Sequence, residues 1–164
     1  MDRRTLLTLL SSIGLVQTTS AASGAPAAPP APAIEPLRLS DAQWKQRLTP
    51  AQYRVLRQEG TEPPGSSPLD REKRAGIFHC AGCNLPLFSS DAKYDSGTGW
   101  PSFFQSLPGA VGTRTDYKLL FPRTEYHCAR CEGHQGHVFG DGPPPTGKRY
   151  CNNGVALVFV AASA

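Results

Sequence analysis

One spacing of cysteines constrains this chain more than any other feature. Cys80 and Cys83 enclose two residues, and Cys128 and Cys131 repeat that spacing far along the chain. A turn with this spacing can aim both sulfurs at one ion, and two such turns complete a tetrahedron. Because the pairs are distant in sequence, the fold must bring two separate hairpins together. The sequence therefore predicts a four-cysteine site for one structural Zn²⁺, with iron as the rival metal.

Two alternatives stay open for these four cysteines. The pairs form disulfides if the chain is exported to an oxidising compartment without a metal. One pair could instead be a thioredoxin-like dithiol, although the strand–helix–strand context of such a motif is missing. A site with four thiolates has no open coordination position, so the metal interpretation predicts a stabilising site and not a catalytic one.

Cys151 is the fifth cysteine and has no partner left. Strand alternation places Arg149, Cys151 and Asn153 on one face. A guanidinium two residues from a thiol favours the thiolate, which is the nucleophilic form, and Asn153 can donate hydrogen bonds on the same side. The alternative is a buried and inert cysteine. We expect Cys151 to carry the chemistry of the protein.

Two histidines follow the second cysteine pair, at His134 and His137. They could extend the metal site, but four thiolates make further ligands redundant. Otherwise they are candidates for acid–base chemistry in a loop that the metal site holds in place. His79 and His127 each precede a cysteine of a pair, and we expect them to make local packing contacts or to contact the metal ligands from outside.

The N-terminal residues have the pattern of an export signal. Arg3 and Arg4 are followed by an apolar stretch, residues 6–16, that is too short to span a bilayer, and small residues end the segment 1–22. The paired arginines resemble a twin-arginine signal, with an ordinary Sec signal as the alternative. Residues 23–36 are mostly Ala and Pro, which predicts an extended linker. We therefore expect an exported, periplasmic protein with its domain at residues 37–164.

Charge and composition exclude several classes of protein. The 17 Lys and Arg exceed the 13 Asp and Glu only slightly and form no basic run, so nucleic acid is not an expected partner. The 16 Gly and 16 Pro disfavour long helices. A zinc-ribbon binding module would explain the paired cysteines but neither Cys151 nor the export signal. A thiol peroxidase on a β scaffold is the other alternative. A comparison of peroxide with methionine sulfoxide as the oxidant would distinguish it from a sulfoxide reductase.

The local patterns predict two short helices and then strands. Ser40 with Gln43, and Thr49 with Gln52, have the spacing of capping boxes, and Gly60 suits the end of the second helix. A mainly β, antiparallel domain with short N-terminal helices is therefore expected. The predicted strands are residues 76–79, 85–88, 117–121, 125–127, 137–139, 148–151 and 155–160, the last as a central strand.

Five segments resemble the B-type methionine-(R)-sulfoxide reductase family. Together they cover about residues 40–162 in the family's order. The resemblance implies two antiparallel sheets in a sandwich-like or barrel-like fold, and a four-cysteine zinc site. The segments are LTPAQYRVLRQEGTEPP (48–64), GIFHCAGCNLPLF (76–88), GTGWPSF (97–103), HCARCEGHQGHVFGDGP (127–143) and GKRYCNN (147–153).

The resemblance also implies roles for individual residues. Cys151 would attack the sulfur of methionine sulfoxide as a thiolate, giving methionine and a cysteine sulfenic acid. His134 and His137 resemble the pair that binds and protonates the sulfoxide oxygen. The remaining implied residues form a polar frame, Arg149, Asp141 and Asn153, and a pocket for the substrate methyl group, Trp100 with Phe103 and Phe139 as walls.

Three positions depart from the family pattern. Thr98 stands where many members have a second, resolving cysteine. With four cysteines on the metal and Cys151 as nucleophile, no thiol is left, so an external reductant, a small thiol or a thioredoxin-like protein, is the expected partner. Asn152 and Gly154 stand where the family usually has an aliphatic residue and serine, which changes details of the pocket. We expect a monomer that acts on free or protein-bound methionine sulfoxide.

Overall fold

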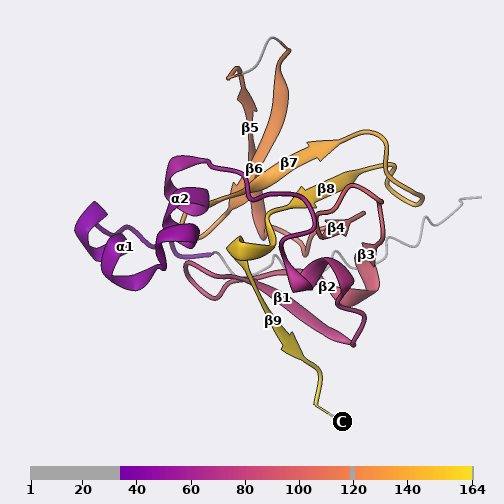
Figure 1. Ribbon diagram of the computed structural model, residues 1–164, viewed down its shortest axis with the longest axis horizontal. Helices are drawn as coiled ribbons and strands as arrows, with labels where there is room; N and C mark the ends of the chain where they lie inside the picture. The colour runs from indigo at the N-terminus through magenta and orange to yellow at the C-terminus, as the bar shows by residue number, and fades with distance from the viewer. Residues whose placement is uncertain (1–33, 119–120, 164) are drawn as a thin grey trace, which may run out of the picture. The chain divides into compact units, whose positions relative to one another are not determined.

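The computed structural model describes residues 34–118 and 121–163 (Figure 1). The expected signal segment 1–22, and most of the expected linker 23–36, lie outside the described residues. Within this part of the chain, no helix has the length and apolar character needed to cross a membrane.

Two short helices open the domain, α1 (Asp41–Arg47) and α2 (Pro50–Gln58). Each begins with the expected capping box. The Ser40 and Thr49 side chains each accept a hydrogen bond from the backbone N–H three residues on, and the side-chain oxygen of the glutamine at that position accepts one from the N–H of the cap residue. These reciprocal bonds satisfy backbone N–H groups that a helix start leaves unpaired, which explains why such short helices form.

The end of α2 differs from the prediction. Glu59, and not Gly60, adopts the left-handed conformation, with φ of 54°. The N–H of Gly60 donates to the carbonyl of Arg54 at 2.9 Å. Arg114 and Lys118 form ion pairs with the Glu59 carboxylate, so this position uses a charged side chain that glycine would lack.

Nine short strands form two antiparallel sheets in the described residues. One sheet has the order β2-β1-β9 and the other β3-β4-β8-β7-β6-β5. The prediction of a mainly β fold with two antiparallel sheets and N-terminal helices is confirmed. The strands are β1 (Gly76–Cys80), β2 (Pro86–Ser89), β3 (Lys93–Tyr94), β4 (Ser102–Phe103), β5 (Val111–Asp116), β6 (Arg123–Cys128), β7 (His134–Phe139), β8 (Arg149–Asn152) and β9 (Leu157–Ala161).

Two strand predictions were wrong. The strand β5 ends at Asp116, so the described residues 117, 118 and 121 of the predicted strand lie outside it, and Tyr117 and Phe121 are 77% and 79% exposed. The strand β5 consists mostly of polar residues. It lies at the edge of the larger sheet, where such residues can remain in contact with solvent. The last strand is also at an edge and not central, because among the described residues β9 pairs with β1 alone, and Val158 and Val160 are about half exposed.

An aromatic core joins the two sheets. Phe88 and Phe103 stack with ring centroids 4.2 Å apart, and Phe78 meets Phe103 edge-on at 5.0 Å. Tyr126 and Tyr150 complete the cluster from the larger sheet. Burial of several aromatic rings, each of large apolar area, fixes how the sheets pack and so holds the strands that carry the site.

The pairing of β7 with β8 sets the geometry of the site. His137 lies opposite Cys151 in this antiparallel pair, so their side chains emerge on one face as neighbours. A Cβ on Gly136 would lie 1.9 Å from the Cys151 carbonyl oxygen. Glycine at this position is therefore needed for β7 to approach the strand that carries Cys151.

Candidate functional site

The fold brings the four paired cysteines into one cluster. Their sulfurs all lie within 4.8 Å of one another, and each residue is less than 5% exposed. Two of the sulfur–sulfur distances, Cys80 to Cys131 and Cys83 to Cys128, are 3.6 and 3.4 Å. Four sulfurs around a tetrahedral ion with bonds of about 2.3 Å would be roughly 3.8 Å apart, whereas a disulfide needs about 2.05 Å. The donor set thus fits a single metal ion with no open position.

The two N-terminal helices hold the two cysteine turns. Arg47 at the end of α1 donates to the carbonyl of Gly82 at 2.7 Å, and Arg57 near the end of α2 donates to that of Cys131 at 2.8 Å. Four thiolates with a divalent ion carry a net negative charge, which nearby guanidinium groups stabilise. The helices therefore contribute both position and charge to the metal cluster.

A separate cavity of about 210 Å³ contains the fifth cysteine. Six of the residues predicted for the site lie along it, and they come from segments far apart in sequence. Phe103, His134 and Asp141 are not among its lining residues. The residues that line it are Thr61, Thr98, Trp100, Arg123, Gly136, His137, Phe139, Arg149, Cys151 and Asn153.

Phe103 is a correction to the predicted pocket. It lies opposite Tyr150 in the β4–β8 pair, whereas its neighbour Ser102 lies opposite Cys151. Because side chains alternate along a strand, Phe103 shares the core face of Tyr150 and is fully buried. Phe139, the other aromatic residue expected in the pocket, does line the cavity.

Cys151 is partly buried, and its surroundings act on its pKa in opposite directions. Burial raises the pKa of the thiol, while the Thr98 hydroxyl and the Arg149 guanidinium lower it, and the pKa remains above that of an ordinary thiol. The Thr98 oxygen lies 4.0 Å from the Cys151 sulfur. The prediction that Arg149 favours the thiolate therefore has the right direction, but burial outweighs it, and a base is needed to remove the proton.

Arg149 is fixed on two sides. Its Nε and one terminal nitrogen donate to the Asp141 carboxylate at 2.9 and 2.8 Å, and its guanidinium lies 4.3 Å from the centre of the Phe139 ring. Asp141 thus stands behind the cavity wall and not in it. A bidentate and stacked guanidinium has little freedom, so this group is a rigid wall beside Cys151.

His134 lies behind the cavity. It is 1% exposed, its Nδ1 is 2.8 Å from Glu125, and its Nε2 has no hydrogen-bond partner among the described residues. Of the two histidines, His137 lines the cavity and His134 does not. The two ring centroids are 5.4 Å apart, so the His134 ring packs against the His137 ring from behind.

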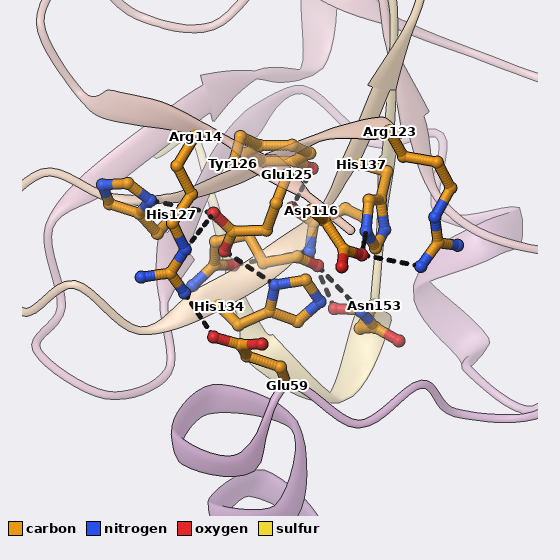
Figure 2. A network of polar contacts seen from close by, with 12 residues as sticks. Glu59, Arg114, Asp116, Arg123, Glu125, Tyr126, His127, His134, His137 and Asn153 are labelled. Carbon is orange, nitrogen blue, oxygen red and sulfur yellow. Dashed lines mark hydrogen bonds and ion pairs between the residues drawn. The ribbon is translucent and has the colours of Figure 1, made fainter. Parts of the chain in front are cut away.

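Glu125 is the buried centre of a charged network (Figure 2). Burial alone would raise its pKa, but hydrogen bonds from His127 and His134 and the Arg114 guanidinium lower the pKa to about 2. His127 thus makes the local contact expected for it. The network continues through Arg114 to Glu59 at the end of α2.

Asp116 holds the second histidine. Its carboxylate oxygen lies 2.8 Å from Nε2 of His137 and 2.7 Å from a terminal nitrogen of Arg123. Sequence reasoning missed Asp116, Arg123 and Glu125, because their contacts depend on the register of β5, β6 and β7. The residues around Asp116 and Arg123 form no motif that would predict these contacts.

Glu62 is a further residue that sequence reasoning missed. Its carbonyl accepts from the indole nitrogen of Trp100 at 3.1 Å, and its N–H donates to the side chain of Asn153 at 3.0 Å. Its carboxylate accepts from the N–H groups of Gly154 and Val155 at 2.5 and 2.9 Å. One buried residue in a loop thereby fixes both Trp100 and the segment that comes after Cys151.

The unusual residues Asn152 and Gly154 have structural partners. Asn152 is buried on the face opposite Cys151 and accepts a hydrogen bond from the hydroxyl of Tyr126 at 2.6 Å. A Cβ on Gly154 would lie 2.0 Å from the Ser67 hydroxyl, so a larger residue at this position would require Ser67 to move. Neither residue obstructs the cavity.

Comparison with known proteins gives a consistent answer. A protein-family model described as the SelR domain matches residues 48–161. The peptide methionine sulfoxide reductase MsrB of Agrobacterium fabrum is 53% identical over 73% of this chain and 90% of its own length. The proteins of the same name from Thiobacillus denitrificans and Pseudomonas savastanoi are 53% and 50% identical, over 92% and 98% of their lengths and 73% and 77% of this chain.

The solved structures that match include one of low similarity. The Mis18 "Yippee-like" domain covers 56% of this chain and 100% of its own, with a TM-score of 0.43 and 17% identity, which supports no inference about function. The sequence relatives are far closer and span most of the domain. This chain belongs to the SelR-domain family, the B-type methionine sulfoxide reductases, as its motifs predicted.

Proposed function

We propose that this protein reduces the (R)-epimer of methionine sulfoxide to methionine, with Cys151 as the nucleophile. The family supports methionine sulfoxide reduction in general. The observation that carries the thiol mechanism is the position of Cys151. It lines the cavity beside the indole of Trp100, with His137 directly opposite on the paired strand.

The chemistry balances with groups that the cavity contains. The thiol proton leaves Cys151, the thiolate attacks the sulfoxide sulfur, and the protonated oxygen departs as hydroxide when the sulfur–oxygen bond breaks, which leaves Cys151 joined to a sulfonium by a sulfur–sulfur bond. The hydroxide then attacks the Cys151 sulfur, and the sulfur–sulfur bond breaks to release the thioether. A thiol and a sulfoxide thereby become a sulfenic acid and a thioether. The sulfoxide oxygen is a poor leaving group until it is protonated, so a proton donor beside Cys151 is essential.

The aromatic walls suit the thioether end of the substrate. Trp100 is anchored through its indole nitrogen to Glu62, which leaves the ring as a fixed apolar surface in the cavity. Phe139 lies under the guanidinium of Arg149 on another side. We propose that the methyl group contacts Trp100 and that the polar oxygen faces His137.

The sulfenic acid must be reduced from outside the chain. Thr98 is the residue beside Cys151, and a hydroxyl cannot form a disulfide. We propose that one external thiol attacks the sulfenic acid to give a mixed disulfide and water, and that a second thiol releases Cys151. A small thiol or a thioredoxin-like protein supplies both electrons.

The metal belongs to the fold and not to the reaction. Cys80, Cys83, Cys128 and Cys131 would hold one Zn²⁺, which supplies stability and no chemistry at Cys151. The pattern of residues 1–22 supports a periplasmic location, where the protein would act as a monomer to repair oxidised exported proteins.

Turnover on separated epimers tests the proposed function. The domain of residues 37–164, loaded with zinc and supplied with dithiothreitol, should convert a peptide containing the (R)-sulfoxide and leave the (S)-sulfoxide unchanged. Cys151→Ser should remove this activity. Equal turnover of both epimers would contradict the proposal, and peroxide consumption without sulfoxide turnover would favour a thiol peroxidase instead.

A further inference from the structure

We propose that Asp116 is a positioning residue, which fixes the proton of His137 on Nε2 and leaves Nδ1 to exchange a proton between Cys151 and the sulfoxide oxygen. The inference rests on the proposed function and specifies how the proton moves from Cys151 to the sulfoxide oxygen. It assigns a role to an acid outside every motif that the sequence analysis used.

The residues come from four neighbouring strands of the larger sheet, and Figure 2 shows three of them, Asp116, Arg123 and His137. Asp116 of β5 and Arg123 of β6 are opposite each other at the end of their hairpin, and His137 of β7 lies opposite Cys151 of β8. One oxygen of Asp116 contacts both Nε2 of His137, at 2.8 Å, and the Arg123 guanidinium, at 2.7 Å. The side chains of Asp116 and His137 are only 10% and 12% exposed.

The charge of Asp116 decides which nitrogen carries the proton. The backbone N–H of Lys118, together with His137 and Arg123, holds the pKa of Asp116 well below its usual range. An ionised carboxylate can only accept hydrogen bonds, so the contact requires hydrogen on Nε2 of His137. In a neutral ring the other nitrogen, Nδ1, then holds the free lone pair and can accept a proton.

Burial, more than the surrounding charges, favours a neutral His137 before substrate binds. Burial lowers its pKa, Asp116 raises it, and Arg123 and His134 lower it, with a net decrease. Arg123 already balances the charge of Asp116, so the pair does not force a proton onto the ring. When Nδ1 takes the proton of Cys151, the same carboxylate stabilises the imidazolium until the proton passes to the sulfoxide oxygen.

His134 does not compete for this role. Its Nδ1 is bound to Glu125, and it is absent from the cavity lining. Its ring contacts that of His137 but has no position opposite Cys151. The two histidines are thus held by separate carboxylates, and Asp116 holds the one that can reach the reacting atoms.

Two readouts on the zinc-loaded domain test the proposal. Nitrogen-15 NMR of the histidine rings reports the tautomer and pKa of His137. A single turnover without reductant measures methionine formed by Cys151 alone. Asp116→Asn should remove the preference for Nε2–H, lower the pKa of His137 and slow the single turnover by about 100-fold. Asp116→Glu should recover part of the rate.

Arg123→Gln provides the opposing variant. Removing the cation should raise the pKa of His137, because Asp116 is no longer balanced, whereas Asp116→Asn lowers it. A loss of packing alone would not shift the pKa in opposite directions. Asp91→Asn, an exposed acid outside the cavity, makes the same charge change and should alter neither the His137 pKa nor the rate.

Several results would overturn the proposal. These are an Nδ1–H tautomer of His137 in the wild type, an unchanged His137 pKa in Asp116→Asn, or an unchanged single turnover in that variant. The wild-type tautomer decides the matter even if a variant fails to fold. Because the tautomer needs no sulfoxide, failure of the proposed function would appear differently, as absent turnover with the predicted tautomer intact.

Discussion

The metal cluster and the cavity use the same side chain in opposite ways. Each of the four clustered cysteines has three other sulfurs within 4.8 Å and is almost completely buried. Cys151 does not belong to that cluster, is partly exposed and lines a cavity. Thiol chemistry is therefore decided by the neighbours, because four sulfurs together bind an ion and one sulfur beside a base can attack a substrate.

The elements that support the two regions differ as well. Arginines from two helices fix the carbonyls of the cysteine turns, so the metal cluster is held by backbone contacts. The cavity is held by side chains, since Asp116, Glu125 and Glu62 each orient a residue that reaches it or lies behind it. Loss of a metal ligand should accordingly damage stability, whereas loss of Cys151 or Asp116 should damage the rate.

Cys151→Ser gives the largest expected change in rate. Methionine formation should fall by about 10⁴-fold or more, because a serine hydroxyl is a far weaker nucleophile toward sulfur. Zinc content and the thermal midpoint should stay at wild-type values. A residual rate within about tenfold of the wild type would break the distinction between the two kinds of cysteine.

Cys128→Ser gives the opposite result. Structural zinc binding contributes on the order of 10 kcal/mol, which is comparable with the whole stability of a small domain. Loss of one ligand should release the ion and unfold the protein, as measured by zinc content and circular dichroism. A variant that keeps the fold without bound metal would show that the cluster is not the stabilising element.

The sequence was sufficient for features that depend on local spacing. The capping boxes at Ser40 and Thr49, and the paired cysteines, were predicted because a few consecutive residues determine them. The family motifs also gave the two sheets. The predictions of 155–160 as a central strand and of 117–121 as a strand failed because apolar content reveals neither which strand lies at an edge nor where a strand ends.

The rest of the candidate site depends on strand register. Phe103 faces the core because it lies opposite Tyr150, while Ser102 takes the place opposite Cys151. Asp116 reaches His137 only because β5, β6 and β7 are neighbours in the sheet. A shift of one residue would reverse every face, and no single-sequence pattern specifies that shift.

Glu125→Gln should have an intermediate effect on stability. The variant leaves Arg114 and two histidines without their anion, at a cost of about 2 to 3 kcal/mol, below that of a fully buried pair since Arg114 is half exposed. Chemical denaturation at neutral pH measures the loss, and Glu59→Gln, at the exposed end of the network, is the control with a smaller change.

The pH dependence of stability depends on the same residue. The folded pKa of Glu125 is about 2, below its ordinary value of 4.5, so its contribution is complete above pH 4.5 and is lost as the pH falls toward 2. The difference in unfolding free energy between wild type and Glu125→Gln should shrink over that range. A difference that does not depend on pH would show that the carboxylate charge is unimportant.

Thr98→Cys should have the smallest effect on the first chemical step and the most informative effect on the fate of the sulfenic acid. The Thr98 oxygen is 4.0 Å from the Cys151 sulfur, so a thiol there could attack the sulfenic acid and form a disulfide with release of water. Single-turnover methionine formation should stay within a few-fold of the wild type.

Mass analysis after one turnover distinguishes a Cys151 sulfenic acid from a disulfide. The wild type should retain a Cys151 sulfenic acid that a dimedone probe labels. Thr98→Cys should not be labelled, and its mass should be lower than that of its reduced form by two hydrogens, because a disulfide has formed. Thr98→Val is the matched control, with the label retained. A wild-type disulfide between Cys151 and one of the metal cysteines would contradict the separation of the two regions, because it would show that the cluster also supplies electrons.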